Sequence, residues 1–141
     1  MSLFRIGILL FACAPRLLEA QTLSNASDVV TGTYSYRIDA ESVEQLGDTV
    51  CFYPLPGSRF RHSRPPNDPR IMWFCFANTE DAKRMLHIPR EDEIKECGLE
   101  GQATVEINEH QTAKEDTDGY DVVRLLTVQK VSKTEHLPCP R

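Results

Sequence analysis

Alternating apolar and polar residues predict a long β-strand that begins at Thr33. Every second residue of Tyr34–Ala40 is apolar, which is the period of a strand with one buried face. The next large apolar residue, Val43, is one position out of phase, and one extra residue is what a β-bulge inserts where a strand bends. The turn signal Gly47-Asp48 ends the run. We therefore expect a long, bent first strand.

Two short aromatic segments, residues 49–53 (TVCFY) and 71–76 (IMWFCF), predict the second and third strands. If they pair as an antiparallel hairpin, alternate residues face the core. The inward set is then Val50, Phe52, Phe74 and Phe76. The outward set is Cys51, Tyr53, Trp73 and Cys75. We interpret the likeness of the segments mainly as a core signal, with an exposed aromatic face at Tyr53 and Trp73 as the alternative.

A change of period after the third strand predicts a short helix over NTEDAKRMLHIP, residues 78–89. Asn78 or Thr79 can cap it, acidic residues follow in its first turn, and Pro89 ends it. The apolar residues at helical spacing are Ala82, Met85 and Leu86. A helix of about two turns is not stable alone, so we expect it to pack on the rest of the fold.

Two further strands follow a charged connector, residues 90–101. Residues 102–110 alternate cleanly and place one apolar set on a single face: Ala103, Val105 and Ile107. An acidic turn around Asp118-Gly119 leads to the last β-rich segment, residues 120–131. The pattern does not assign an inward face to that segment.

The predicted order is strand, strand, strand, helix, strand, strand, which is the order of the OB-fold. We therefore expect an all-β domain with one short helix over residues 33–141, in the form of a small five-stranded OB-like Greek-key barrel. Other small β-barrels with one helix are the alternative. The expectation depends on element order and not on a family motif.

The first twenty residues have the three parts of a secretory signal peptide. Arg5 supplies an early positive charge, an apolar run extends over Ile6–Ala14, and Ala20 is a small residue suited to cleavage. The run is too short to span a membrane, and no other segment is long and apolar enough. We expect cleavage near Ala20, a flexible leader over residues 21–32, and a periplasmic or secreted protein. Acylation at Cys13, as in bacterial lipoproteins, is the alternative.

Cleavage after Ala20 would remove Cys13 and leave four cysteines: Cys51, Cys75, Cys97 and Cys139. An even number in an exported chain of this size indicates two disulfides. The four cysteines include no C-x-x-C pair, which argues against a zinc site.

Strand pairing predicts how these cysteines are connected. The hairpin of the two aromatic segments places Cys51 opposite Cys75. In the last hairpin, placing Thr104 near Lys130 brings Cys97 opposite about Leu137, two residues from Cys139. The predicted bridges are therefore 51–75 and 97–139. A bridge between Cys75 and Cys97, which leaves Cys51 for Cys139, is the alternative.

The chain has a net charge of −5, and −6 without residues 1–20, so its overall field favours neither nucleic acid nor an anionic membrane. One loop between the aromatic segments is locally positive and contains an aromatic residue. The residues of this basic loop are Arg59, Phe60, Arg61, His62, Arg64 and Arg70. The loop is either a proline-stiffened connector or a docking loop, because the planar donors of arginine suit carboxylates and phosphates.

Catalytic chemistry has little support in the sequence. The four histidines (His62, His87, His110 and His136) are not at metal-ligand spacing, and no nucleophile elbow is present. The acidic residues of the expected first strand, Asp39, Glu41 and Glu44, are the one arrangement that could hold a metal. We expect no cofactor, no metal and no enzymatic activity.

These observations predict an exported, disulfide-stapled module that binds or inhibits an unknown protein or envelope component. One alternative is a glycan-binding subunit of a secreted assembly. A metal-dependent hydrolase is the other. The sequence determines neither the ligand nor the oligomeric state.

Overall fold

The computed structural model describes residues 26–58, 71–113 and 119–139. Over these ranges the chain is mostly β, with six strands in one sheet, two α-helices and a 3₁₀ helix. In chain order the elements are β1 (Asp28–Arg37), α1 (Ala40–Leu46), β2 (Val50–Pro54), β3 (Phe74–Phe76), α2 (Thr79–Met85), η1 (Glu91–Glu93), β4 (Gly98–Gln111), β5 (Asp121–Val131) and β6 (Glu135–His136). None of the helices formed by these residues is long and apolar enough to cross a membrane.

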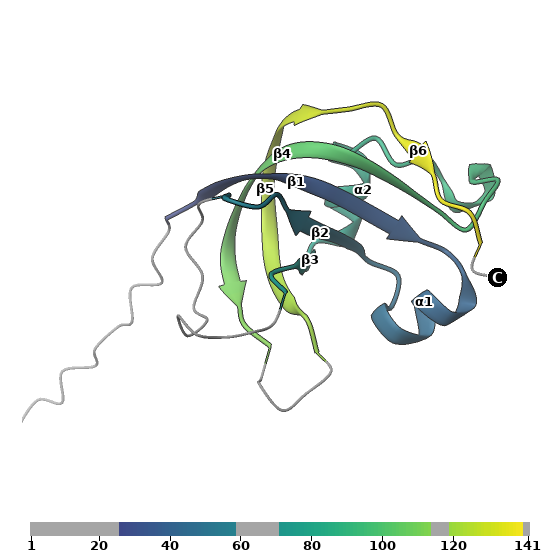
Figure 1. Cartoon of the computed structure of the whole chain (residues 1–141), viewed down its shortest axis with the longest axis horizontal. Helices are drawn as coiled ribbons and strands as arrows, with labels where there is room; N and C mark the ends of the chain where they lie inside the picture. Colours follow the sequence, from purple (N-terminus) through teal and green to yellow (C-terminus); the bar gives the residue numbers. More distant parts are fainter. Residues whose placement is uncertain (1–25, 59–70, 114–118, 140–141) are drawn as a thin grey trace, which may run out of the picture.

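The strands pair in the order β1-β2-β3-β5-β4-β6, and β1 also pairs with β4 (Figure 1). The β1–β4 ladder runs from Asp28 opposite Ile107 to Arg37 opposite Gly98. β3 and β5 are parallel, and the other pairs are antiparallel. Each strand from β1 to β5 therefore has a partner on both sides, and β6 extends the sheet beside β4.

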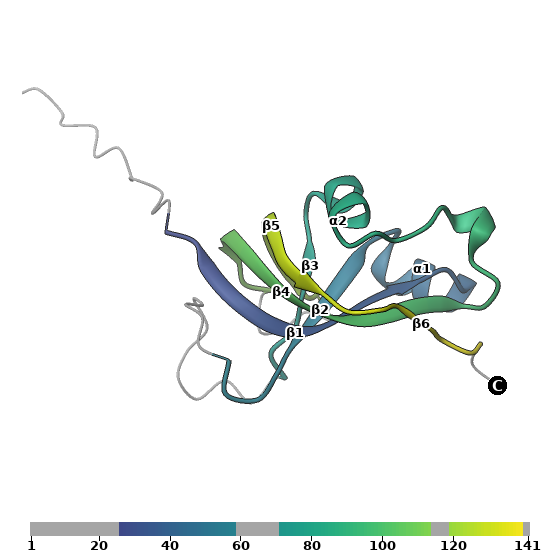
Figure 2. The same cartoon turned by 90° about the horizontal axis from the view of Figure 1, so that it is seen from above.

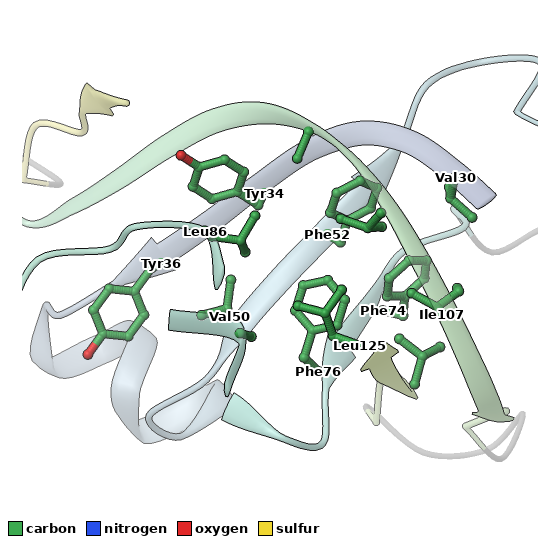
Figure 3. Close-up of a cluster of buried hydrophobic side chains, with 14 of the residues drawn as sticks. Val30, Tyr34, Tyr36, Val50, Phe52, Phe74, Phe76, Leu86, Ile107 and Leu125 are labelled. Carbon is green, nitrogen blue, oxygen red and sulfur yellow. The ribbon is translucent and has the colours of Figure 1, made fainter. Parts of the chain in front are cut away.

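The apolar core lies between these strands and α2 (Figure 3). Phe52 and Phe74 stack with their ring centroids 5.4 Å apart, and Phe76 lies against both rings. Helix α2 lies across the core from β1 and β4 (Figure 2) and contributes the buried Ala82, and the buried Leu86 follows at its end. The core therefore draws on both aromatic strands and on the short helix.

The inward faces predicted for β2, β3 and β4 are confirmed. Their buried members are Val50, Phe52, Phe74, Phe76, Ala103, Val105 and Ile107. Helix α2 also forms where expected, but the Asn78 side chain makes no capping hydrogen bond. Instead, its amide bonds the backbone N–H and C=O of Leu125 on β5, each at 2.9 Å. Asn78 thus attaches the start of α2 to the sheet.

The predicted bent strand is wrong beyond Arg37, because Ala40–Leu46 form α1. Asp39 caps this helix, and its Oδ1 accepts a hydrogen bond from the backbone N–H of Ser42 at 3.0 Å. Gly47 follows the helix with φ at +77°, a conformation that glycine adopts at little cost. The change of phase in the sequence therefore marks a change from strand to helix, not a bulge.

Strand β1 begins earlier than predicted, at Asp28, so residues 28–32 are not part of a flexible leader. Their partner is β4, with Val30 opposite Val105 and buried in the core. Because that partner is distant in sequence, the local pattern gives little sign of this pairing. The remaining described part of the predicted leader, residues 26 and 27, precedes the strand.

The described sheet has six strands and not five, and two α-helices form where one was expected. β4 begins at Gly98, inside the predicted connector, and its first residues pair with β6. Thr104 lies opposite Lys130, as predicted. The β4–β5 register then shifts at three places, which explains why no regular inward face could be assigned to β5.

Candidate binding face

Two disulfides join the four described cysteines. Cys51 and Cys75 lie opposite each other on β2 and β3, and their bridge is buried. The second bridge joins Cys97 to Cys139 and fixes the segment after β6. Both predicted pairings are confirmed, and the alternative bridge between Cys75 and Cys97 is wrong.

Three aromatic side chains extend from the Cys51–Cys75 bridge along the outer face, and we call them the aromatic cluster: Tyr53, Trp73 and Tyr120. The rings of Tyr53 and Trp73 are parallel within 10°, with centroids 5.7 Å apart. Trp73 and Tyr120 are 5.5 Å apart and tilted by 38°. Tyr53 is 41% exposed and the other two are partly buried, so the cluster presents aromatic surface to solvent.

Helix α1 borders the aromatic cluster and is held to it by a hydrogen bond. The Tyr120 hydroxyl donates to the backbone carbonyl of Leu46 at 2.8 Å, which ties the start of β5 to the end of α1. No residue of α1 is buried. The position of this helix therefore depends on a few polar contacts more than on core packing.

A pocket of about 220 Å³ lies between α1 and the outer face of β1 and β2, and we call it the α1 pocket. β1 contributes Ser35 and Arg37 to its lining, and β2 contributes Cys51 and Tyr53. The remaining lining residues are Ser42, Leu46, Gly47 and Thr49. The pocket thus shares Tyr53 with the aromatic cluster and rests on the disulfide.

Arg37 is the one charged residue that lines the described α1 pocket. Burial raises the pKa of Tyr53, and the charge of Arg37 opposes that shift. Hydrogen bonds from Ser42 lower the pKa of Asp39, and Arg37 contributes more weakly in the same direction. The positive charge of Arg37 therefore acts both on Tyr53, which lines the pocket, and on Asp39, the cap of α1.

A larger cleft of about 820 Å³ lies between α2, η1 and the end of β1. Each of its three basic side chains has a carboxylate partner within salt-bridge distance. The pairs are Lys83–Asp48 at 2.7 Å, Arg84–Asp81 at 2.6 Å and Arg90–Asp92 at 3.1 Å. The cations of this cleft are thus already compensated by the protein itself.

Among the described residues, no group of three or more His, Cys, Asp or Glu side chains could hold a metal ion. Asp39, Glu41 and Glu44 do not share a strand as expected, since Asp39 caps α1 and the two glutamates lie on that helix. A buried Asp121 contacts His110 Nε2 at 2.9 Å and accepts a hydrogen bond from the Ala113 N–H. The two residues lie where β4 ends and β5 begins.

Of the binding residues predicted from sequence, the structure brings Tyr53 and Trp73 together. The basic-loop residues Arg59, Phe60, Arg61, His62, Arg64 and Arg70 lie outside the described ranges. Sequence analysis missed Arg37 and Tyr120. Arg37 could have been found, because it has the same outward parity on β1 as Thr33. Tyr120 could not, because its partners, Trp73 just before β3 and Leu46 of α1, are distant from it in the sequence.

Comparison with protein-family models, curated proteins and solved structures finds no significant match to this chain. Its function is therefore inferred from its own residues.

Proposed function

We propose that this protein is an exported, disulfide-stapled binding module, and that it contacts a partner through the outer face of β2 and β3. The aromatic cluster is the observation that carries this proposal. Tyrosine and tryptophan supply much of the energy at protein interfaces because they bury large areas with few rotatable bonds. A stacked pair such as the exposed Tyr53 and the partly buried Trp73 is therefore a suitable anchor for a partner.

An OB-like barrel is part of the proposal. The pairing of β1 with both β2 and β4, together with the parallel pairing of β3 and β5, supports a closed ring of five strands. The helix between β3 and β4 fits the same topology. OB-type barrels bind ligands on the face of strands two and three, which is where the aromatic cluster lies.

Export is supported by two independent features. The signal-like segment 1–20 predicts secretion, and two disulfides suit an oxidising compartment. Intact-mass measurement of the protein from periplasm and medium tests this directly. We expect a chain that begins at Gln21 and contains two disulfides. A chain that retains residues 1–20 in the cytoplasm would contradict export, and a lipid on Cys13 would establish the alternative anchor.

The basic loop is proposed to assist docking. In the sequence it connects Tyr53 to Trp73, and its arginines add local positive charge to an acidic protein. Replacing Arg59, Arg61 and Arg64 with alanine should weaken partner binding, more so at low salt, and leave the unfolding midpoint nearly unchanged. If the triple variant captures the same partners as the parent, the loop is only a connector.

Site-specific photo-cross-linking tests the proposed binding face. A photoreactive phenylalanine analogue replaces Tyr53 in one variant and Leu126 on β5 in the other. The two positions are matched in exposure, at 41% and 39%. We expect a discrete cross-linked species from envelope or medium fractions only with the Tyr53 variant. Equal products from both positions, or none from position 53, would contradict the proposal.

A further inference from the structure

The α1 pocket contains hydrogen-bond donors that the described protein leaves free. Arg37, Ser35 and Tyr53 line it, and their side chains make no hydrogen bond or ion pair with any other described residue. A guanidinium has five N–H donors and no acceptor, and an arginine in a pocket can present two of them side by side. The Arg37 guanidinium thus has N–H donors available for an acceptor from outside the described residues.

The charge of the pocket matches this donor set. No carboxylate is among its described lining residues, so Arg37 gives it a net positive charge. The carboxyl group whose pKa the charge of Arg37 helps to lower is Asp39, and its Oδ1 already accepts the Ser42 N–H as the cap of α1. Asp39 Oδ1 is therefore used as the helix cap, its Oδ2 is buried without a hydrogen-bond partner among the described residues, and Asp39 is not one of the residues that line the pocket.

The surroundings of the pocket define what kind of anion would fit. Tyr53 belongs both to the pocket and to the stacked aromatic pair, so a group held by Arg37 lies beside an apolar aromatic surface. The buried Cys51–Cys75 bridge fixes the strands beneath it. A volume of about 220 Å³ is enough for a carboxylate and its short aliphatic stem.

We propose that the α1 pocket is the specificity pocket of the binding face and receives the carboxylate of an aspartate or glutamate side chain from a protein partner. In this complex the Arg37 guanidinium donates two hydrogen bonds to the carboxylate, and Ser35 donates a third. The neighbouring partner side chains pack on Tyr53 and Trp73. The inference rests on the proposed function, since it names the chemistry that the same face recognises.

A protein carboxylate fits the pocket better than a sugar does. A sugar ring presents hydroxyls that both donate and accept, and sites for them need acceptors as well as donors. The hydroxyls that line this pocket can accept as well as donate, but no carboxylate or carboxamide is among its described lining residues to accept from the hydroxyls of a sugar. Tyrosine, tryptophan and arginine together are also the residues enriched where protein interfaces are strongest.

Nuclear magnetic resonance titration of the secreted protein with two blocked tripeptides tests the pocket. One is acetyl-Leu-Glu-Leu-amide, and the other has glutamine in place of glutamate. Trp73 is the only tryptophan in the chain, so its indole N–H resonance reports on the face without ambiguity. We expect saturable shifts of the Trp73 indole and the Arg37 Nε–H with the glutamate peptide, at least tenfold weaker with the glutamine peptide.

Arginine variants supply the controls. Arg37→Gln should lower the affinity for the glutamate peptide at least tenfold, and Arg37→Lys should lower it less. Arg124→Gln, at an exposed position of β5, should leave that affinity unchanged. If Arg37→Gln does not fold, the lysine variant and the peptide pair still decide the matter. Equal affinity for both peptides, or an unchanged affinity in the Arg37 variants, would overturn the proposal.

Three further outcomes show which part of the argument fails. Tighter binding of glucuronate oligomers than of the glutamate peptide would overturn the assignment to a protein carboxylate. If position 53 cross-links a partner whose capture Arg37→Gln does not affect, the pocket assignment fails and the binding face stands. If position 53 cross-links nothing, the proposed function itself fails.

Discussion

Individual aromatic side chains fill the core of this protein, and substitution of Phe74 measures what one of them contributes to stability. Its ring is fully buried, stacks on Phe52 and meets the edge of Phe76. Phe74→Ala should lower the free energy of unfolding by about 3–5 kcal/mol, because the surrounding rings cannot fill the space. Urea unfolding measures this, with Leu126→Ala on the surface of β5 as the small-effect control. A loss below about 1 kcal/mol would mean that the faces of β3 are assigned incorrectly.

Also at the scale of residues, the Asp48 carboxylate links α2 to β1 by an ion pair with Lys83 and a hydrogen bond from Tyr36. It accepts hydrogen bonds from Lys83 at 2.7 Å and from the Tyr36 hydroxyl at 2.9 Å. The Lys83 hydrogen bond is the main cause that lowers the pKa of Asp48, and burial opposes it. Burial alone would lower the pKa of Lys83, but its bonds to Asp48 and Tyr36 overcome that effect and raise it.

The pH dependence of stability follows from the direction of the Asp48 shift. Because its pKa is lower in the folded chain than the ordinary 3.8, the pair stabilises above about pH 4 and is lost as pH falls below it. Asp48→Asn should therefore destabilise at pH 6 by less than about 1 kcal/mol, since the carboxylate is largely exposed, and the difference should shrink at pH 3. Unfolding curves across this range measure it. A difference that persists at pH 3, or that is unchanged in a Lys83→Met background, would contradict the pairing.

At the scale of elements, α1 depends on its ends. None of its residues is buried, and it is held by the Asp39 cap and the Tyr120–Leu46 hydrogen bond. Asp39→Ala should cost about 1 kcal/mol of helix stability and speed amide exchange in α1, because the Ser42 N–H loses its acceptor. Gln45→Ala, on the exposed helix surface, is the matched control and should change little. Equal exchange in both variants would show that the cap does not hold α1.

At the scale of the whole molecule, one disulfide joins β2 to β3 under the proposed binding face, and the other attaches the segment after β6 to the start of β4. They close spans of 24 and 42 residues. In the chain-entropy model each contributes about 2–4 kcal/mol, so replacing either pair by alanine should lower stability by that amount. Denaturant unfolding measures the loss, and the loss of Cys51–Cys75 should also weaken partner binding. Non-reducing peptide mapping checks the pairing, which a Cys75–Cys97 peptide would refute.

The sequence predicted most of the sheet and half of the candidate site. Val50, Phe52, Phe74 and Phe76 could be assigned because a strand whose alternate side chains are buried shows that burial in its own pattern. Asp39 and Gly47 are also sequence signals for the start and end of α1. The strand predicted from the alternation before Asp39 nevertheless continued through this segment. The registers assumed for the two hairpins, with Cys51 opposite Cys75 and Thr104 opposite Lys130, are those of the structure, and both disulfide pairings followed from them.

What the sequence determined by itself was local: the inward faces of β2, β3 and β4, the short helix α2, and the cysteines whose pairing follows from neighbouring strands. What only the tertiary structure decided depends on contacts between distant segments. The pairing of β1 with β4, the approach of Tyr120 to Leu46 and the α1 pocket around Arg37 join residues from separate elements. Periodicity indicates whether a residue is buried, but it does not indicate which distant residue packs against it, and the proposed binding face is made of residues from distant segments.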